Sequence, residues 1–181
     1  TGHSIGADLY YIPIGIYRSQ EEIDNSPHPA GTTVNDLQYK DVNGDSKIDN
    51  KDRKRLDKTN TTEIIFGTQI TVGFQAFDMA ILLQGQANAW RDYWIPQGLF
   101  GNVLEEMVKN RPTAGNPNSK YPNITYDNSQ VSAFDSEFWL RDASFLRLKS
   151  VELGYRLPSS ILNKIGIKDF RVYLNAFNMI T

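Results

Sequence analysis

The run Ile64-Ile-Phe-Gly-Thr-Gln-Ile-Thr-Val-Gly-Phe-Gln-Ala-Phe-Asp-Met-Ala-Ile-Leu-Leu-Gln-Gly85 decides the fold class of this chain. From residue 64 to 75, apolar residues alternate with glycine and polar residues, and the alternation resumes after a short connection at 76–78. A period of two is typical of a β-strand with one apolar and one polar face. We therefore predict two strands joined by a tight turn. One face carries Ile64, Phe66, Ile70, Val72, Phe74, Met79, Ile81 and Leu83, and Gln69, Gln75 and Gln84 point the other way.

Strand character returns at residues 145–157, but its apolar phase slips near residues 149–150. Such a slip predicts a β-bulge, or a strand that passes from a watery to an apolar environment. The apolar residues are Leu146 and Leu148 before the slip and Val151, Leu153, Tyr155 and Leu157 after it.

A short helix is expected after this strand, from Pro158 to Lys164. Proline and serine suit the first turn of a helix, and Gly166 is placed to end it. Alternation then resumes from Phe170 to Ala176, which predicts one more strand.

The connections between these strands alternate in length. The segment 87–138 is long and rich in Asn, Pro and Gly, with one helical turn expected at 98–110, whereas the turns at 76–78 and 158–168 are short. Transmembrane β-barrels pair short periplasmic turns with long extracellular loops in this way. The loops of a soluble β-sandwich also vary in length, so the rhythm alone leaves both architectures open.

Composition excludes several classes of protein. The 181 residues include 19 Lys and Arg and 21 Asp and Glu, so the formal net charge of −2 offers no basic surface for nucleic acid. Cysteine is absent, which excludes disulfides and thiolate metal sites. Mean hydropathy is −0.45 and no apolar run is long enough for a membrane helix. We find no nucleophile elbow, phosphate loop or zinc signature, so we expect no enzymatic activity.

An acidic loop at 41–52 has the ligand spacing of a calcium loop. Asp41, Asn43, Asp45, the Lys47 carbonyl, Asp49 and Asp52 occupy positions 1, 3, 5, 7, 9 and 12 of an EF-hand-like pattern. Carboxylates packed this closely repel one another unless a cation lies between them. Ser46 stands where such loops carry glycine, Asp52 replaces the longer glutamate, and no long flanking helices are apparent. We expect a structural Ca²⁺ rather than Mg²⁺, the alternative being a solvated acidic turn without an ion.

Three aromatic residues, Trp90, Tyr93 and Trp94, cluster at the start of the long connection. Flat apolar rings beside polar groups suit a sugar or peptide ligand, which makes them candidate substrate-binding residues. The simpler interpretation, which we prefer, is that they pack within the loop or belong to an aromatic girdle at a lipid interface.

Several stretches, in their order and spacing, resemble the C-terminal barrel region of the SusC/RagA family of TonB-linked outer-membrane proteins. The most specific is Leu140-Arg-Asp-Ala-Ser-Phe-Leu-Arg-Leu148. The others lie at 15–23, 39–52, 65–74, 76–85, 138–158 and 171–178, so the resemblance covers nearly the whole chain. One departure is Ser46, where the family pattern usually carries glycine.

This resemblance implies an all-β fold, a fragment of a large antiparallel transmembrane β-barrel with long extracellular loops, of the kind with about 22 strands. Residues 1–181 are then one partial barrel, with 41–52 as an EF-hand-like loop and 87–138 as a long extracellular loop, and the plug and final strands are expected outside this chain. We expect the outer membrane of a Gram-negative bacterium of the Bacteroidetes kind.

The resemblance also implies how such a protein works. A SusD-like surface lipoprotein would capture a glycan or peptide, the TonB complex would supply energy, and the apolar wall would face outer-membrane lipid. Loop residues 87–138 are expected to carry substrate specificity, because loops vary while the wall must satisfy the bilayer. The alternative from another class is a soluble extracellular calcium-dependent module that binds carbohydrate.

Overall fold

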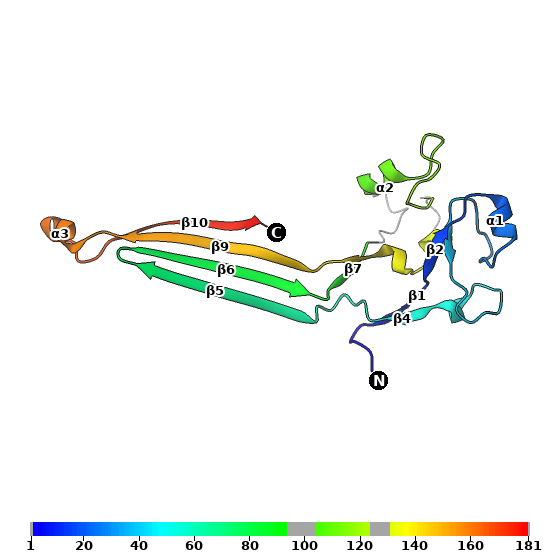
Figure 1. Cartoon of the computed structure of the whole chain (residues 1–181), viewed down its shortest axis with the longest axis horizontal. Helices are drawn as coiled ribbons and strands as arrows, with labels where there is room; N and C mark the ends of the chain where they lie inside the picture. Colours follow the sequence, from blue (N-terminus) through cyan, green and yellow to red (C-terminus); the bar gives the residue numbers. More distant parts are fainter. Residues whose placement is uncertain (1, 94–103, 124–130, 181) are drawn as a thin grey trace. The chain divides into compact units, whose positions relative to one another are not determined.

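The computed structural model describes residues 2–93, 104–123 and 131–180, and most of its regular structure is β-strand (Figure 1). The chain divides into two compact units. The loop unit comprises the described residues of 1–60 and 91–141, and the sheet unit comprises those of 61–90 and 142–181. The predicted acidic loop and most of the long connection therefore belong to one unit, and the predicted long strands to the other.

The sheet unit is an antiparallel sheet with the strand order β10-β9-β6-β5 (Figure 1). Its strands are β5 (Ile64–Phe74), β6 (Phe77–Ala87), β9 (Phe145–Arg156) and β10 (Arg171–Ile180). The turn between β5 and β6 is shorter than the predicted 76–78, because Phe74 pairs with Phe77 and only Gln75 and Ala76 lie between the strands. Gln75 makes this tight reversal with a positive φ of 54°.

The register gathers the apolar side chains of all these strands on one face. Directly paired residues of antiparallel strands point to the same side of the sheet. Ile70 pairs with Ile81, Ile81 with Val151, and Val151 with Ala176, and the same matching repeats along the strands. The predicted apolar belt is confirmed and extends over the full width of the sheet. We call it the apolar face: Ile64, Phe66, Ile70, Val72, Phe74, Phe77, Met79, Ile81, Leu83, Leu146, Leu148, Val151, Leu153, Tyr155, Val172, Leu174 and Ala176.

The predicted bulge is present in β9. Leu82 pairs with Ser150 and Leu83 with Leu148, so Lys149 is the extra residue in the register shift. The extra residue Lys149 explains why the apolar residues of this strand change from even to odd positions in the sequence. Without it, Leu146 and Leu148 would point to the opposite face, which carries Gln69, Gln84, Glu152 and Arg171.

The connection from β9 to β10 contains the predicted short helix. α3 (Ser159–Leu162) follows Pro158 and continues into the 3₁₀ turn η4 (Asn163–Ile165). Gly166 ends it in the left-handed conformation, with φ of 73°, which glycine adopts without steric cost.

The loop unit is built from short elements. β1 (Asp8–Tyr10) pairs with β4 (Lys54–Leu56), and β2 (Pro13–Ile16) with β3 (Leu37–Tyr39). β7 (Trp90–Asp92) pairs with β8 (Leu140–Asp142), and the division between the units falls within both strands, since Trp90 and Asp142 belong to the sheet unit. The helices are α1 (Gln20–Asp24) and α2 (Glu105–Asn110), and the 3₁₀ turns are η1 (Asn50–Asp52), η2 (Val131–Ala133) and η3 (Glu137–Trp139).

α1 begins at Gln20 because the Ser19 hydroxyl accepts a hydrogen bond from the Glu22 N–H at 3.2 Å. One sequence expectation changes in this unit. A helical turn was expected at 98–110. Its second part is α2, and residues 98–103 of its first part lie outside the described residues.

A small core holds the loop unit together. Tyr11, Leu37, Tyr39, Ile48 and Val131 are buried against one another, and the Tyr39 hydroxyl donates to the Val131 carbonyl at 2.7 Å. Burial raises the pKa of Tyr39 far above its usual value, so this hydroxyl stays protonated and keeps its donor role. The return of the long connection at residue 131 is thereby attached to β3. Among the described residues, no helix has the length and apolar character that crossing a membrane requires.

Candidate functional site

The apolar face of the sheet unit is open to solvent. Leu174 is 76% exposed and Phe74 70%, and no member of the face is among the buried apolar residues of the described chain. Removing one such side chain from water contributes about 1.5–3 kcal/mol. A surface of this size is characteristic of contact with a membrane or another protein. The interdigitated second layer that a β-sandwich requires is absent from the described part of the sheet unit.

The opposite face of the sheet carries an ion network that sequence reasoning missed. The Arg171 Nε donates to Asp78 Oδ1 at 3.0 Å, and its Nη2 donates to Glu152 Oε1 at 2.6 Å. A Cβ on Gly154 would lie within 3.0 Å of both the Arg171 guanidinium and the Asp78 carboxylate, so these side-chain ends would have to shift if residue 154 carried a side chain. The sequence pattern that could have revealed the network is the alternation along each strand, because Asp78, Glu152 and Arg171 all occupy polar-face positions.

The acidic loop folds around its own carboxylates. Asp41 accepts hydrogen bonds from the Gly44 N–H at 2.6 Å and the Ser46 N–H at 2.8 Å. Asp45 Oδ1 accepts the Lys47 N–H at 3.0 Å, and Asn43 Oδ1 accepts the Asp45 N–H at 2.9 Å. Asp49 caps η1 through the Lys51 N–H at 2.7 Å. The predicted ligand residues thus all belong to one local turn structure.

Asp52 closes the loop from inside. Its side chain is fully buried and accepts the Val42 N–H at 2.9 Å on Oδ1 and the Asp49 N–H at 2.8 Å on Oδ2. Burial by itself would raise the pKa of this carboxyl, but hydrogen bonds from the backbone of Asp49, Val42 and Asn43 outweigh it and hold the pKa below its usual value. Asp52 is therefore a carboxylate at neutral pH.

The donor set fits a hard cation in chemistry and in backbone conformation. Ser46 stands at position 6 of the pattern, where calcium loops carry glycine, and its φ of 63° is the left-handed conformation that glycine there favours. Among the described residues, however, no group of three or more histidine or acidic side chains is arranged as a ready metal cage. The calcium assignment therefore stays a prediction that rests on ligand type and spacing.

The aromatic candidates are placed in part. The Trp90 Nε1 donates to Asn88 Oδ1 at 3.4 Å, and the Arg141 guanidinium lies 5.9 Å from the centre of the Tyr93 ring. Trp94 lies outside the described residues. A shared substrate platform of these residues stays a prediction.

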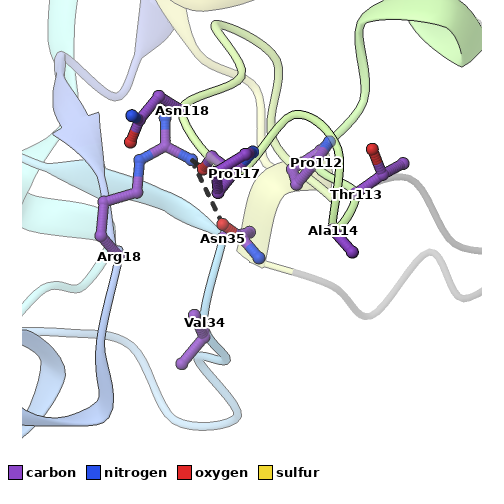
Figure 2. A pocket seen from close by; sticks show the side chains of 8 residues that line it. All are labelled: Arg18, Val34, Asn35, Pro112, Thr113, Ala114, Pro117 and Asn118. Carbon is purple, nitrogen blue, oxygen red and sulfur yellow. Dashed lines mark hydrogen bonds between the residues drawn. The ribbon is translucent and has the colours of Figure 1, made fainter.

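A cavity of 440 Å³ in the loop unit is lined by residues of the long connection and of the N-terminal part of the chain (Figure 2). Its lining is Arg18, Val34, Asn35, Pro112, Thr113, Ala114, Pro117 and Asn118. Arg18 Nη1 donates to Asn35 Oδ1 at 3.2 Å and to the Pro117 carbonyl at 3.1 Å, and Nη2 donates to the Ser119 carbonyl. Sequence reasoning missed Arg18, because its partners at 117–119 are about a hundred residues away and follow no local period.

Two curated proteins match nearly the whole chain. TonB-dependent receptor P26 of Formosa agariphila is 31% identical over 173 residues, which are 92% of this chain and 17% of that protein. TonB-dependent receptor P3 of the same organism is 24% identical over 189 aligned residues, 99% of this chain and 18% of that protein. No family model matches the chain.

Solved structures share its fold. The RagAB peptide importer in the open-open state superposes with a TM-score of 0.63 and 22% identity, over 96% of this chain and 18% of that one. The structure of the RagAB peptide transporter gives a TM-score of 0.62 and 21% identity over the same 96%. The chain thus spans less than a fifth of the length of each of these relatives. These relatives are TonB-dependent receptors and peptide transporters.

Proposed function

This chain belongs to the TonB-dependent receptors, and from that premise we propose that it forms part of the wall and the extracellular region of an outer-membrane transporter of the SusC/RagA type, whose fold it shares. The whole protein would import glycans or other large nutrients, with TonB as the source of energy. The observation that carries the proposal is the apolar face, which is exposed on one side of a single sheet.

Strand length supports the proposal. A transmembrane β-strand needs about 9–11 residues at the usual tilt. β5 and β6 have 11 residues each, β9 has 12 and β10 has 10. Each strand is therefore long enough to cross the hydrocarbon layer once.

The connections support an orientation. The β5–β6 turn and the α3 segment lie at one end of the antiparallel sheet, and the long connections meet the strands at the other end. Short connections mark the periplasmic side of such barrels and long ones the extracellular side. The loop unit is then extracellular, where a SusD-like lipoprotein would deliver the substrate.

The substrate would meet the loop unit. The 440 Å³ cavity at Arg18 is the surface that we assign to cargo. For Trp90, Tyr93 and Trp94 we keep the structural interpretation, with substrate binding as the alternative. RagAB is described as a peptide importer, and the polar cavity would accept peptide as well as oligosaccharide because its lining offers amide, hydroxyl and guanidinium groups.

We assign a structural role to Ca²⁺ in the acidic loop. Asp41, Asn43, Asp45, the Lys47 carbonyl, Asp49 and Asp52 would supply the oxygens, and Arg18 and the other cavity residues take no part. The ion would hold an extracellular loop in one conformation and would perform no chemistry, since no ligand position is reserved for a substrate.

A pair of lysine substitutions in the full-length protein tests the wall. Ile81 lies midway along β6 on the apolar face, and Gln84 lies three residues further on the polar face. A lysine on the lipid side near the bilayer centre costs about 2–4 kcal/mol. Ile81→Lys should strongly reduce folded protein in the outer-membrane fraction, and Gln84→Lys should leave it near the wild-type level.

Equal effects of the two lysines would contradict the lipid assignment. So would recovery of this chain by itself as a stable monomer in buffer without detergent, with one cooperative melt. That result would favour the alternative, a soluble calcium-dependent carbohydrate-binding module.

A further inference from the structure

The connection between β9 and β10 exposes more apolar surface than a turn in water requires. Ile165 is 62% exposed and Ile161 51%, and Ile167 and Phe170 are also exposed, whereas Leu162 is buried. Turns in water are built from glycine, proline and short polar residues. Four large apolar side chains within ten residues therefore indicate a surface that faces something other than water.

Local geometry groups these side chains. Ile161 and Ile165 are four residues apart across the helical turn formed by α3 and η4, a spacing that brings side chains toward the same side. After Gly166, the Ile167 N–H donates to the Leu162 carbonyl at 3.1 Å, which folds the chain back against the helix. The result is a short cap on the β9–β10 hairpin (Figure 1), whose exposed side chains are both apolar and charged.

This cap is continuous with the apolar face of the sheet. The Leu157 N–H donates to the Phe170 carbonyl at 3.0 Å, which extends the pairing of β9 with β10 by one step. Because sides alternate along a strand, Phe170 lies on the side of Val172, and Leu157 on the side of Tyr155. The Phe77 and Tyr155 rings, 4.7 Å apart, occupy the same end of that face.

Charge also suits a lipid surface. Lys164 and Lys168 are exposed between the apolar residues, and Asp169 is the acidic residue of the segment. A lysine can bury its hydrocarbon stem along apolar groups while its ammonium reaches lipid phosphate.

We propose that segment 157–170 is an interfacial anchor in the periplasmic leaflet of the membrane. Ile161, Ile165, Ile167 and Phe170 enter the boundary between headgroups and acyl chains, and Lys164 and Lys168 bind phospholipid phosphate. The β5–β6 turn at the same end consists of Gln75 and Ala76 and so has no large apolar side chain of its own. The anchor would set the height of the β9–β10 hairpin in the bilayer. This inference rests on the proposed function, which places the apolar face in lipid.

Fluorescence quenching in the full-length transporter tests the anchor. This chain has no cysteine, so Ile165→Cys can be labelled with the environment-sensitive dye NBD after any cysteines elsewhere in the protein are replaced. The labelled protein is reconstituted in phospholipid vesicles that contain lipid brominated either near the headgroup or near the methyl end of the acyl chain. Ile161→Cys provides a second position in case one label disturbs the turn.

Two further positions serve as controls. Gln75→Cys labels the exposed polar turn at the same end of the sheet, and Leu174→Cys labels the apolar face within β10, two residues beyond Val172. We expect headgroup-proximal bromine to quench the labels at 161 and 165 about twofold or more over the label at 75, while deep bromine quenches the label at 174.

The outcomes separate the two claims. If labels at 161 and 165 behave like the label at 75 while the label at 174 is quenched, the anchor is refuted and the membrane wall stands. If the label at 174 also escapes quenching, the proposed function itself fails. Phosphatidylglycerol should increase shallow quenching at 165, and the double variant Lys164→Glu, Lys168→Glu should remove that increase. An unchanged increase would overturn the assigned role of the lysines.

Discussion

At the residue scale, the acidic loop depends on carboxylates that already bind backbone N–H groups. Asp41, Asp45 and Asp52 accept hydrogen bonds from residues two to ten positions away and so shape the loop by themselves. A cation would add an electrostatic reason for the same conformation, because it offsets the mutual repulsion of the acidic groups. Removing the cation and removing the hydrogen bonds are therefore separable experiments.

We predict that Ca²⁺ stabilises the full-length protein through this loop. An ion that binds only the folded state adds about 2.7 kcal/mol at ~100 times its dissociation constant. Excess Ca²⁺ should raise the melting temperature of the detergent-solubilised protein, and a chelator should lower it. Asp45→Ala should abolish the difference while leaving the strands intact, since Asp45 lies in the loop unit and outside every strand.

A matched control is Asp24→Ala, which removes an exposed carboxylate outside the pattern. If Ca²⁺ changes neither the melt nor proteolysis near residues 41–52, the loop is a solvated acidic turn. The wall assignment would survive that result.

Asp52 should make the loop sensitive to acid. Its pKa is lower in the folded protein than in the unfolded chain, so its contribution to stability is fully present above about pH 4, the pKa of an unfolded aspartate. The contribution is lost as the pH falls through the lower, folded pKa. Hydrogen exchange of a peptide covering 41–52 should therefore accelerate below about pH 4 beyond the intrinsic pH effect.

Asp52→Ala should show fast exchange in that peptide already at pH 7, because it leaves the N–H groups of Val42 and Asp49 without a partner. Loss of a hydrogen bond to a charged group costs about 1.5–3 kcal/mol. Protection equal to the wild type at pH 7 would show that these hydrogen bonds do not hold the loop.

At the element scale, the strands carry two kinds of information on their two faces. The apolar face forms wherever apolar residues recur at every second position of a strand. The polar face, in contrast, contains the specific network of Arg171, Asp78 and Glu152. Glycine at 154 leaves room for the guanidinium of Arg171 on the neighbouring strand. The network therefore depends on register as well as on composition.

Gly154→Ala should destabilise the barrel by about 1–3 kcal/mol, because its Cβ would force the Arg171 guanidinium away from its partners. Gly67→Ala is the matched control, because residue 67 lies on the polar face like residue 154. Its Cβ would be at an ordinary van der Waals distance of 3.5 Å from the Leu83 carbonyl oxygen. Urea unfolding of the full-length protein in detergent measures both. Equal midpoints for the two variants would mean that Arg171 relocates without loss.

At the scale of the whole molecule, the division into a sheet unit and a loop unit separates two requirements. Strands that contact lipid must pair every backbone group and keep one face apolar. The loop unit has its own core at Tyr11, Leu37, Tyr39, Ile48 and Val131, and its connecting segments are of the kind that tolerates sequence variation. Specificity is therefore expected in the loop unit.

We predict that exchange of residues 87–138 between paralogous transporters changes substrate preference. Because Arg18 donates to Asn35 and to the carbonyls of Pro117 and Ser119, residue 18 and the acceptor at 35 should be exchanged together with the segment. Growth on defined glycans and peptides is the measurement. A preference that still follows the parent barrel after this exchange would refute a role of the segment in specificity.

How much could be predicted from the sequence is seen by comparing the two units. Alternation located the long strands, the apolar face shared by β5 and β6, and the bulge at Lys149, because each depends on a period of two. Proline, serine and glycine signals located the helix that Gly166 ends, because helix capping depends on near neighbours. The family resemblance, carried by runs such as Leu140–Leu148, pointed to the transporter class that the relatives support. The same reasoning placed the acidic residues on one loop.

Only the tertiary structure showed which distant residues meet. Arg18 with Pro117, Tyr39 with Val131, and Arg171 with Asp78 are each joined across about ninety residues or more, and no local pattern encodes such pairs. The length of the β5–β6 turn was also set by strand pairing, because a register that pairs Phe74 with Phe77 leaves two residues between the strands. Local periodicity determines which side of a strand is apolar, but the free energy of packing and hydrogen bonding over the whole chain determines which strand or loop lies beside it.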